Sequence, residues 1–185
     1  MNWYKRFAVL AVLLTALLFV IITNIRAGHK EYTAGVTFLP DNQLLPALLK
    51  DFDESRSEIR CALYMFKTDK DSSSPTSQLL NAMLRALERG VQVGIIFETA
   101  GKTDITTKYN THTGKTLTSA GAKIVFDSPD QRLHTKMCVI DSKTVYIGSH
   151  NYTFSAMERN AEVTVRIRSP EVAAESLSYL GKLGL

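Results

Sequence analysis

The feature that most constrains the fold is a repeated alternation of two patterns from residue 36 onward. Short apolar runs rich in β-branched residues fit buried strands, and the stretches between them carry apolar residues at helical spacing. We expect strands at 36–39, 59–66, 91–97, 123–126, 135–140, 144–148 and 163–167. We expect helices at 42–57, 76–89, roughly 107–119 and 170–183. This order predicts an α/β sandwich in which a mixed, mostly parallel sheet is flanked by helices.

The N-terminal segment has a different composition from the rest of the chain. The run 7–23 is apolar apart from two threonines, and at about 1.5 Å per residue it would cover roughly 26 Å, close to the hydrocarbon thickness of a bilayer. A cleaved signal peptide is the alternative, but Ile25 stands where a small residue is expected before the cleavage point. We therefore expect a transmembrane helix that anchors the chain in 1–27, a linker at 28–35 and a folded domain at 36–185.

Charge and cysteine content narrow the possible partners. The formal net charge is +4, and a mild basic excess fits an anionic partner, either nucleic acid or an acidic membrane surface.

The two cysteines, Cys61 and Cys138, are too few for a disulfide scaffold or a cysteine zinc site. Each lies in an apolar run, so we expect buried thiols.

Four polar side chains in the last third of the chain are spaced so that they can meet. In a strand, residues i and i+2 share a face. His134 and Lys136 therefore point the same way at the start of one predicted strand, and Ser149 and Asn151 do so at the end of the next. If a turn near 141–143 joins the two strands as a hairpin, all four side chains converge on one point.

This set of side chains suits phosphoryl chemistry. It offers a nucleophile or proton carrier, a fixed positive charge and two neutral hydrogen-bond donors, and attack at phosphorus requires that the non-bridging oxygens be neutralised and held. Gly148 has no Cβ, so we expect the backbone to turn tightly there beside a ligand. Asp141 suits the organisation of the turn better than contact with a phosphate, because like charges repel.

The same residues carry a resemblance to a known family. The pattern is H-x-K, four residues, D, six residues and G-S-x-N, filled by His134, Lys136, Asp141, Gly148, Ser149 and Asn151. It resembles the HKD signature of the phospholipase D superfamily, and the likeness extends over most of the chain after residue 36. The chain is most similar to the small single-motif bacterial endonucleases of the Nuc type, with the mitochondrial Zucchini-like members second. Glu162 matches a downstream position where bacterial relatives read N-x-E-N and this chain reads 160-NAEV-163.

The resemblance implies a metal-independent phosphodiesterase that needs no cofactor. Active sites of this superfamily contain two HKD motifs and this chain carries one, so a homodimer with a shared active site is implied. His134 of one chain would form a phosphohistidine, while the partner's His134 would act as general acid and then as general base. By similarity the catalytic residues are His134, Lys136, Asp141, Asn151 and Glu162. The substrate-binding residues are Ser149, Lys136, Asn151 and Gly148, and no metal ligand is expected.

The substrate is left open between nucleic acid and lipid. Lys102, Lys108, His112 and Lys115 lie on the segment after the strand 91–97 and could flank a nucleic-acid backbone, or they could form an ordinary solvated helix face. Nucleic acid, whether DNA or RNA, is favoured by the basic charge and by the single-motif architecture. A phospholipid such as phosphatidylcholine or cardiolipin is favoured by the expected anchor. A catalytically silent nucleic-acid-binding dimer is the third possibility.

The expected location follows from the anchor together with the resemblance. Both point to a bacterial inner membrane with the folded domain in the periplasm. Secretion after signal cleavage and a mitochondrial outer membrane are the alternatives. The direction in which the segment would cross is weakly determined, because Lys5 and Arg6 before it are nearly balanced by Arg26 and Lys30 after it.

Overall fold

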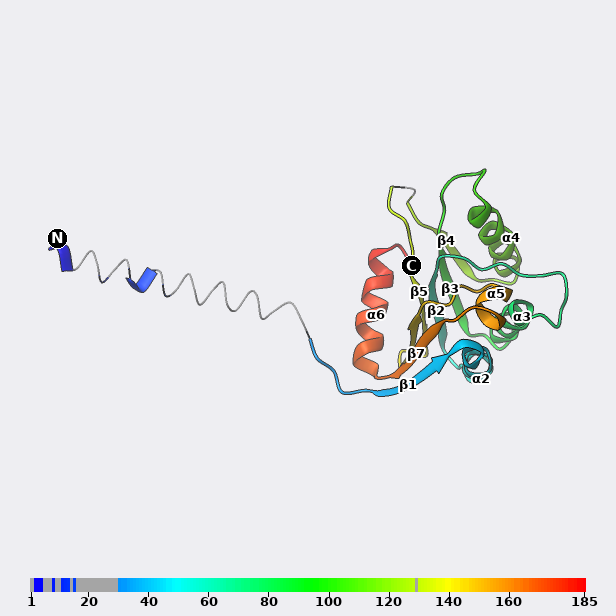
Figure 1. The fold of residues 1–185 in the computed structure, drawn as a ribbon, viewed down its shortest axis with the longest axis horizontal. Coiled ribbons are helices and arrows are strands. Elements are labelled where there is room, and N and C mark those ends of the chain that lie inside the picture. The colour runs from blue at the N-terminus through cyan, green and yellow to red at the C-terminus, as the bar shows by residue number, and fades with distance from the viewer. Residues whose placement is uncertain (1, 5–7, 9–10, 14, 16–29, 129) are drawn as a thin grey trace. The chain divides into compact units, whose positions relative to one another are not determined.

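The computed structural model describes residues 2–4, 8, 11–13, 15, 30–128 and 130–185. The chain divides into two units, residues 1–33 and residues 34–185, and the second unit holds the sheet and the helices considered below (Figure 1). Its strands are β1 (Gly35–Pro40), β2 (Glu58–Leu63), β3 (Gln92–Phe97), β4 (Lys123–Phe126), β5 (Lys136–Ile140), β6 (Thr144–Gly148) and β7 (Val163–Arg168). Its helices are the 3-10 helix η1 (Asp41–Gln43), α2 (Leu44–Glu54), α3 (Pro75–Glu88), α4 (Ile105–Ser119), α5 (Phe154–Glu158) and α6 (Pro170–Lys182).

The seven strands form one mixed sheet in the order β1-β7-β6-β5-β2-β3-β4. Among the described residues, β2, β3 and β4 run parallel, whereas β5, β6, β7 and β1 are joined to their neighbours by antiparallel pairing. The prediction of a mixed α/β sheet is confirmed, but the expectation that it is mostly parallel is wrong. The reason is that β5 turns back beside β2, so that every later strand alternates in direction.

Helices cover both faces of the sheet. α2, α3, α4 and α5 lie on one face and α6 lies on the other (Figure 1). Side chains of a strand alternate between faces, so Ile95 belongs to the larger apolar cluster with Phe52 and Met83, whereas its neighbour Ile96 packs with Leu180 of α6. The continuous apolar runs noted in the sequence are therefore strands that are buried on both sides.

The predicted helices are present, and one short helix was missed. The expected helix at 42–57 ends three residues early, because Ser55 leaves the helical conformation and turns its backbone N–H and hydroxyl back to the Phe52 carbonyl. Helix α5 (Phe154–Glu158) was not predicted. It is five residues long, too short for an apolar periodicity, and the Thr153 hydroxyl caps its start by accepting from the Ala156 N–H.

Cys61 and Cys138 are joined by a disulfide. They lie directly opposite each other on the antiparallel strands β2 and β5, and both are completely buried. The expectation that they are buried is confirmed, but the expectation of free thiols is wrong. The apolar patterning placed each cysteine in the core without revealing that strand register brings them face to face.

The expected membrane anchor requires correction. Among the residues that the structure describes, no helix has the length and apolar character needed to cross a bilayer. Most of the segment 1–27 lies outside the described residues. The predicted location in a bacterial inner membrane, with the domain in the periplasm, depended on such a helix and is corrected with it.

Candidate active site

The candidate site lies along one edge of the sheet, and this edge is formed by the ends of the strands and not by an outermost strand. Strands β2, β3, β4 and β6 end at this edge, and β5 and β7 begin there, because of the parallel and antiparallel pairing described above. Residues just before β5, just after β6 and just before β7 therefore meet. The structure in this way brings His134, Lys136, Ser149, Asn151 and Glu162 to a common edge.

His134 and Lys136 are organised around Tyr64. The Tyr64 ring packs edge-on against the His134 imidazole with 4.7 Å between centroids, and Lys136 Nζ lies 4.8 Å from the centroid of the same ring. Lys136 Nζ also donates a hydrogen bond of 2.8 Å to the His134 carbonyl oxygen. The ring and the cation together fix how the two side chains of the H-x-K motif lie relative to each other.

Tyr64 was not predicted as a site residue. It follows the end of β2, and its backbone N–H donates to the Thr135 carbonyl oxygen at 2.9 Å, which places it beside the start of β5. Its position in an apolar strand run gave no indication of a functional role. The signal that would have found it is the antiparallel pairing of β2 with β5, which local patterns do not contain.

The local electrostatics favour a neutral imidazole. Burial lowers the pKa of His134, and the positive charges of Lys136 and Arg132 lower it further. Burial also lowers the pKa of Lys136, against the opposing effect of the Glu162 carboxylate. A neutral imidazole has a free lone pair, which is the form that can attack phosphorus.

Ser149 and Glu162 form a hydrogen-bonded pair at the ends of β6 and β7. The Ser149 hydroxyl donates to Glu162 Oε2, and the Asn160 side-chain amide donates to Glu162 Oε1 at 3.0 Å. Among the described residues, no hydrogen bond joins Glu162 to a histidine of the same chain. Val163 departs from the family pattern, but it serves this site through its backbone, which exchanges hydrogen bonds with Ser149.

Gly148 is required for a different reason from the one expected. A Cβ at this position would lie 2.3 Å from the Val163 carbonyl oxygen and 2.3 Å from Thr164 Oγ1. The glycine therefore permits close approach of β6 to β7, rather than a backbone conformation forbidden to other residues. This close approach sets the spacing between Ser149 and Glu162.

Of the two residues that follow Ser149, His150 has a structural role and Asn151 is a candidate for contact with a ligand. The His150 ring is buried and bonded on both nitrogens, to Thr164 Oγ1 at 2.8 Å and to the Asp41 carbonyl oxygen at 2.9 Å. His150 thus holds the strand ends together. Asn151 Oδ1 is buried without a hydrogen-bond partner among the described residues, and an unpaired buried polar atom of this kind is uncommon in native structures.

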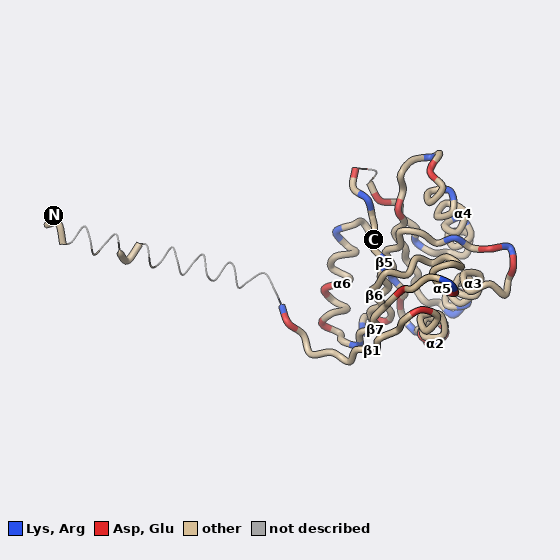
Figure 2. The backbone as a smooth tube through the Cα atoms, viewed as in Figure 1, with Lys and Arg blue, Asp and Glu red and all other residues tan. Residues whose placement is uncertain are grey.

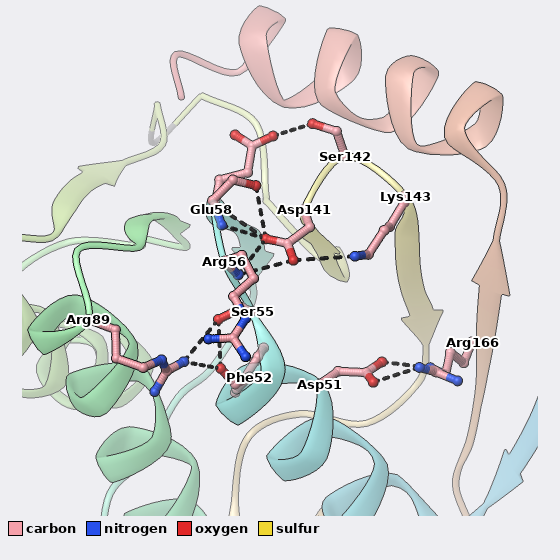
Figure 3. A network of polar contacts seen from close by, with 11 residues as sticks. Asp51, Phe52, Ser55, Arg56, Glu58, Arg89, Asp141, Ser142, Lys143 and Arg166 are labelled. Carbon is pink, nitrogen blue, oxygen red and sulfur yellow. Dashed lines mark hydrogen bonds and ion pairs between the residues drawn. The ribbon is translucent and has the colours of Figure 1, made fainter.

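Asp141 does not join the other motif residues. It follows β5 and so lies at the opposite end of that strand from His134. Its carboxylate accepts the backbone N–H groups of Arg56, Ser57 and Glu58 at 2.8–3.2 Å (Figure 3). Burial raises its pKa, but these hydrogen bonds outweigh burial and bring the pKa to about 2. The geometry gives Asp141 a structural role in the turn between β5 and β6.

The described residues offer no ready metal site. Within residues 30–128 and 130–185, no three histidine, cysteine, aspartate or glutamate side chains are grouped as ligands of one ion would be. The charge that would meet an anionic ligand at the candidate site comes from side chains, chiefly Lys136, with Arg132 nearby.

An α/β sandwich in which an H-x-K strand lies beside a strand ending in G-S-x-N defines a phospholipase D-like fold and site. The chain belongs to this superfamily: residues 48–183 match the family described as "Cardiolipin synthase, PLD-like domain". Members of the superfamily act as phosphodiester hydrolases or transferases. The resemblance inferred from the motif is thereby confirmed.

The chain is also similar to individual curated proteins and, in fold, to a solved structure. Cardiolipin synthase B from Shigella flexneri is 27% identical over 146 residues, covering 70% of this chain and 33% of the relative. Polyphosphate kinase from Salmonella typhimurium is 25% identical over 133 residues, covering 63% of this chain and 18% of the relative. The chain thus spans a third or less of these relatives. The crystal structure of Nuc from Salmonella typhimurium, a phospholipase D family member, superimposes with a TM-score of 0.69 at 23% identity, covering 82% of this chain and 94% of that chain.

Proposed function

We propose that this protein is a metal-independent phosphodiesterase that cleaves nucleic acid, most simply as an endonuclease, with His134 as the nucleophile. The observation that carries the proposal is the placement of His134 and Lys136 around Tyr64 at the edge where Ser149, Asn151 and Glu162 also meet. A neutral imidazole beside a fixed cation is the arrangement that attack on a phosphodiester needs.

The reaction proceeds in two displacements. An imidazole nitrogen of His134 bonds to phosphorus while the bond from phosphorus to the leaving oxygen breaks, and the partner subunit's His134 gives that oxygen a proton. Water then gives a proton to the partner subunit's His134 and attacks phosphorus, which releases His134. Lys136 and Asn151 hold the non-bridging oxygens in both steps. Because the two histidines must differ in protonation, the rate has a bell-shaped dependence on pH.

A homodimer supplies the second histidine, and an exposed apolar surface beside the site supports it. Val36 and Phe38 of the edge strand β1 are 62% and 64% exposed, and Ile147 and Val163 are 43% and 38% exposed. We call these four residues the edge patch. Strand register puts Phe38 and Ile147 opposite the same residue, Val165, so they lie in one row of one sheet face. The patch reaches the site directly, since Ile147 precedes Gly148 and Val163 follows Glu162.

Nucleic acid is favoured as the substrate by a group of basic side chains on α4 and the loop before it. Lys102, Lys108, His112 and Lys115 line one hollow of about 330 Å³ at α4 and the loop before it, and several positive charges cluster there (Figure 2). Helix α4 packs against the site, because the Asn110 amide donates to the Tyr64 carbonyl oxygen at 2.9 Å. The basic side chains of α4 lie on its exposed face, on the other side of the helix from Asn110, so a polyanion bound there runs along the outer surface of the helix, and its binding should weaken as salt rises.

A lipid phosphodiester is the second candidate. It is favoured by the description of the matching family and by the similarity to cardiolipin synthase B, since both names refer to the phospholipid cardiolipin. The same histidine chemistry serves either substrate, because both present a phosphodiester. The two candidates therefore differ in what binds around the site and not in the catalytic step.

The test is cleavage of labelled single-stranded DNA and RNA by the full chain in excess EDTA, for wild type and His134→Ala. Parallel reactions measure headgroup release from vesicles of phosphatidylcholine and of cardiolipin. Cleavage of nucleic acid by wild type alone would support the proposal. Turnover of lipid alone would move the function to the second candidate. A folded dimer that turns over neither substrate but retains DNA would indicate a silent binding protein.

A further inference from the structure

Two carboxyl groups outside the H-x-K and G-S-x-N motifs hold the backbone immediately before His134. The Leu133 N–H donates to Glu98 Oε2 at 2.5 Å and to Asp127 Oδ2 at 3.0 Å. Glu98 follows β3 and Asp127 follows β4, so the end of β3, 35 residues earlier in the chain, and the end of β4, six residues earlier, meet at this amide. Two oxygens that accept the same hydrogen necessarily lie close to each other.

No strong positive partner among the described residues would balance a negative charge on Glu98 beside that of Asp127. The residue is 2% exposed, and its only salt bridge among the described residues is with Arg132, 3.9 Å away and with a side chain 65% exposed. An ion pair that is long and largely solvated contributes little. If both carboxylates that accept the Leu133 N–H were ionised, they would repel each other, and buried Glu98 would also carry the cost of desolvation.

Other charged groups around the pair are few. Asp104, the N-terminal cap of α4, interacts with the same Arg132, and Lys182 of α6 lines a hollow of about 220 Å³ with Asp127 and Arg132. Burial raises the pKa of Glu98, the Leu133 hydrogen bond opposes this, and the neighbouring Asp127 raises it further. Glu98 therefore keeps its proton to a higher pH than an ordinary glutamate does.

We propose that Glu98 and Asp127 share one proton, and that this carboxyl pair positions His134 by holding the Leu133 amide. The remaining contacts of the segment agree. The Leu133 side chain is buried in the smaller apolar cluster on the α6 face, and Asp127 is itself fixed through Oδ1, which accepts the Thr99 N–H at 2.7 Å. With Leu133 held through both its side chain and its amide, His134 keeps its place against Tyr64.

The consequence is a pH dependence that does not originate in the reacting histidines. Loss of the shared proton at high pH sets two negative charges against each other and drives the two carboxylates apart, so the Leu133 amide can no longer be held by both and His134 shifts from its position beside Lys136. Glu98 and Asp127 are positioning residues in this scheme, because they act through His134 and touch no reacting atom. The effect on the rate rests on the proposed function, whereas the shared proton and the held amide do not.

The kinetic test compares wild type, Glu98→Gln and Glu98→Ala, with Asp130→Asn as the matched control. Glutamine reproduces the protonated acid, since its oxygen accepts from Leu133 and its nitrogen donates to Asp127. We expect the alkaline limb of kcat to move upward by roughly half a pH unit or more in Glu98→Gln. In Glu98→Ala we expect kcat to fall about 10- to 100-fold with little change in KM.

Asp130→Asn removes an exposed carboxylate from the same loop and should keep the wild-type profile. Identical pH profiles for wild type and Glu98→Gln would overturn the proposal.

The second test needs no activity and is made on the full chain by NMR. The Leu133 amide proton shift is followed against pH in ¹⁵N-labelled wild type and in Glu98→Gln. We expect a transition in wild type with a midpoint above the ordinary glutamate range near 4.3, and no such transition in Glu98→Gln. A wild-type midpoint at or below that range would refute the shared proton. If no phosphodiester were cleaved at all, the proposed function would fail, while this titration would still decide the carboxyl pair.

Discussion

The Tyr64 ring packs edge-on against the His134 imidazole, with 4.7 Å between the centroids and 62° between the planes. Lys136 approaches the same ring from its face. Replacing the ring by Tyr64→Leu should lower kcat by about tenfold, because both motif side chains lose a contact that orients them. Tyr64→Phe keeps the ring and should lose much less. Steady-state kinetics of the two variants decide this, and equal losses would mean that the hydroxyl, and not the ring, is what matters.

Gly148 should not tolerate even one added methyl group. Gly148→Ala would place a Cβ 2.3 Å from backbone and side-chain atoms of β7, so we expect a loss of about 1–3 kcal/mol in unfolding free energy together with loss of activity. The matched control is Gly181→Ala in α6, where nothing lies within 4 Å of an added Cβ. That change should be neutral or stabilise by up to about 1 kcal/mol. Equal denaturant midpoints for the two variants would contradict this explanation.

Asp141 should make the fold sensitive to acid. Its pKa is about 2 in the folded chain, below the value near 3.9 of an unfolded aspartate. The folded state therefore favours the carboxylate, and this contribution is fully present above about pH 4 and is lost as the pH falls towards 2. It amounts to about 2–3 kcal/mol. Unfolding free energies measured between pH 2 and pH 7 should show a shallower acid dependence for Asp141→Asn than for wild type, and parallel curves would count against it.

The Cys61–Cys138 disulfide should contribute to stability and resist reduction in the native state. It closes a long loop, since the cysteines are 77 residues apart, and cross-links of this kind typically contribute about 2–5 kcal/mol. Both cysteines are fully buried, so a reductant should act slowly until the chain opens. The measurement is thermal unfolding of wild type and of the Cys61→Ala, Cys138→Ala double variant. Alkylation of two thiols in unreduced, denatured protein would show that the bond is absent.

The edge patch should be needed for dimerisation and hence for turnover. Phe38→Glu places a charge in the middle of an exposed apolar row, so we expect the dimer dissociation constant to rise at least about tenfold and the rate at low protein concentration to fall with it. Ile105→Glu is the control, because Ile105 is similarly exposed but lies at the start of α4. Sedimentation velocity separates the outcomes. A Phe38→Glu protein that remained as dimeric as the control would place the interface elsewhere.

Local sequence patterns were enough to locate the strands and the longer helices of the fold, but not the short helix α5. Runs such as 123–126 and 144–148 coincide with β4 and β6 because β-branched residues in a short apolar stretch already specify a buried strand. The helices at 76–89 and 170–183 were expected from their apolar spacing, and in the structure each begins at a proline. Strand direction could not be obtained in this way, because pairing depends on contacts far apart in the sequence.

The same limit explains what was missed in the candidate site. The H-x-K and G-S-x-N residues were found because their spacing is local and fits the period of a strand. Tyr64 and Glu98 each contact a segment remote in the sequence, and Asp127 contacts Leu133 across a loop of no regular pattern, so no local motif contains them. Asp141 shows the converse case, in which membership of a motif does not require a place beside His134.

The disulfide also divides the chain in a way that its linear order hides. Residues 62–137, which contain α3, β3, α4 and β4, form a covalently closed ring once Cys61 and Cys138 are bonded. A single protease cut anywhere in this ring leaves one connected molecule, whereas a cut before Cys61 or after Cys138 releases a fragment. The cleavage site of a nicked sample can therefore be assigned to one side or the other by comparing its mass with and without reductant.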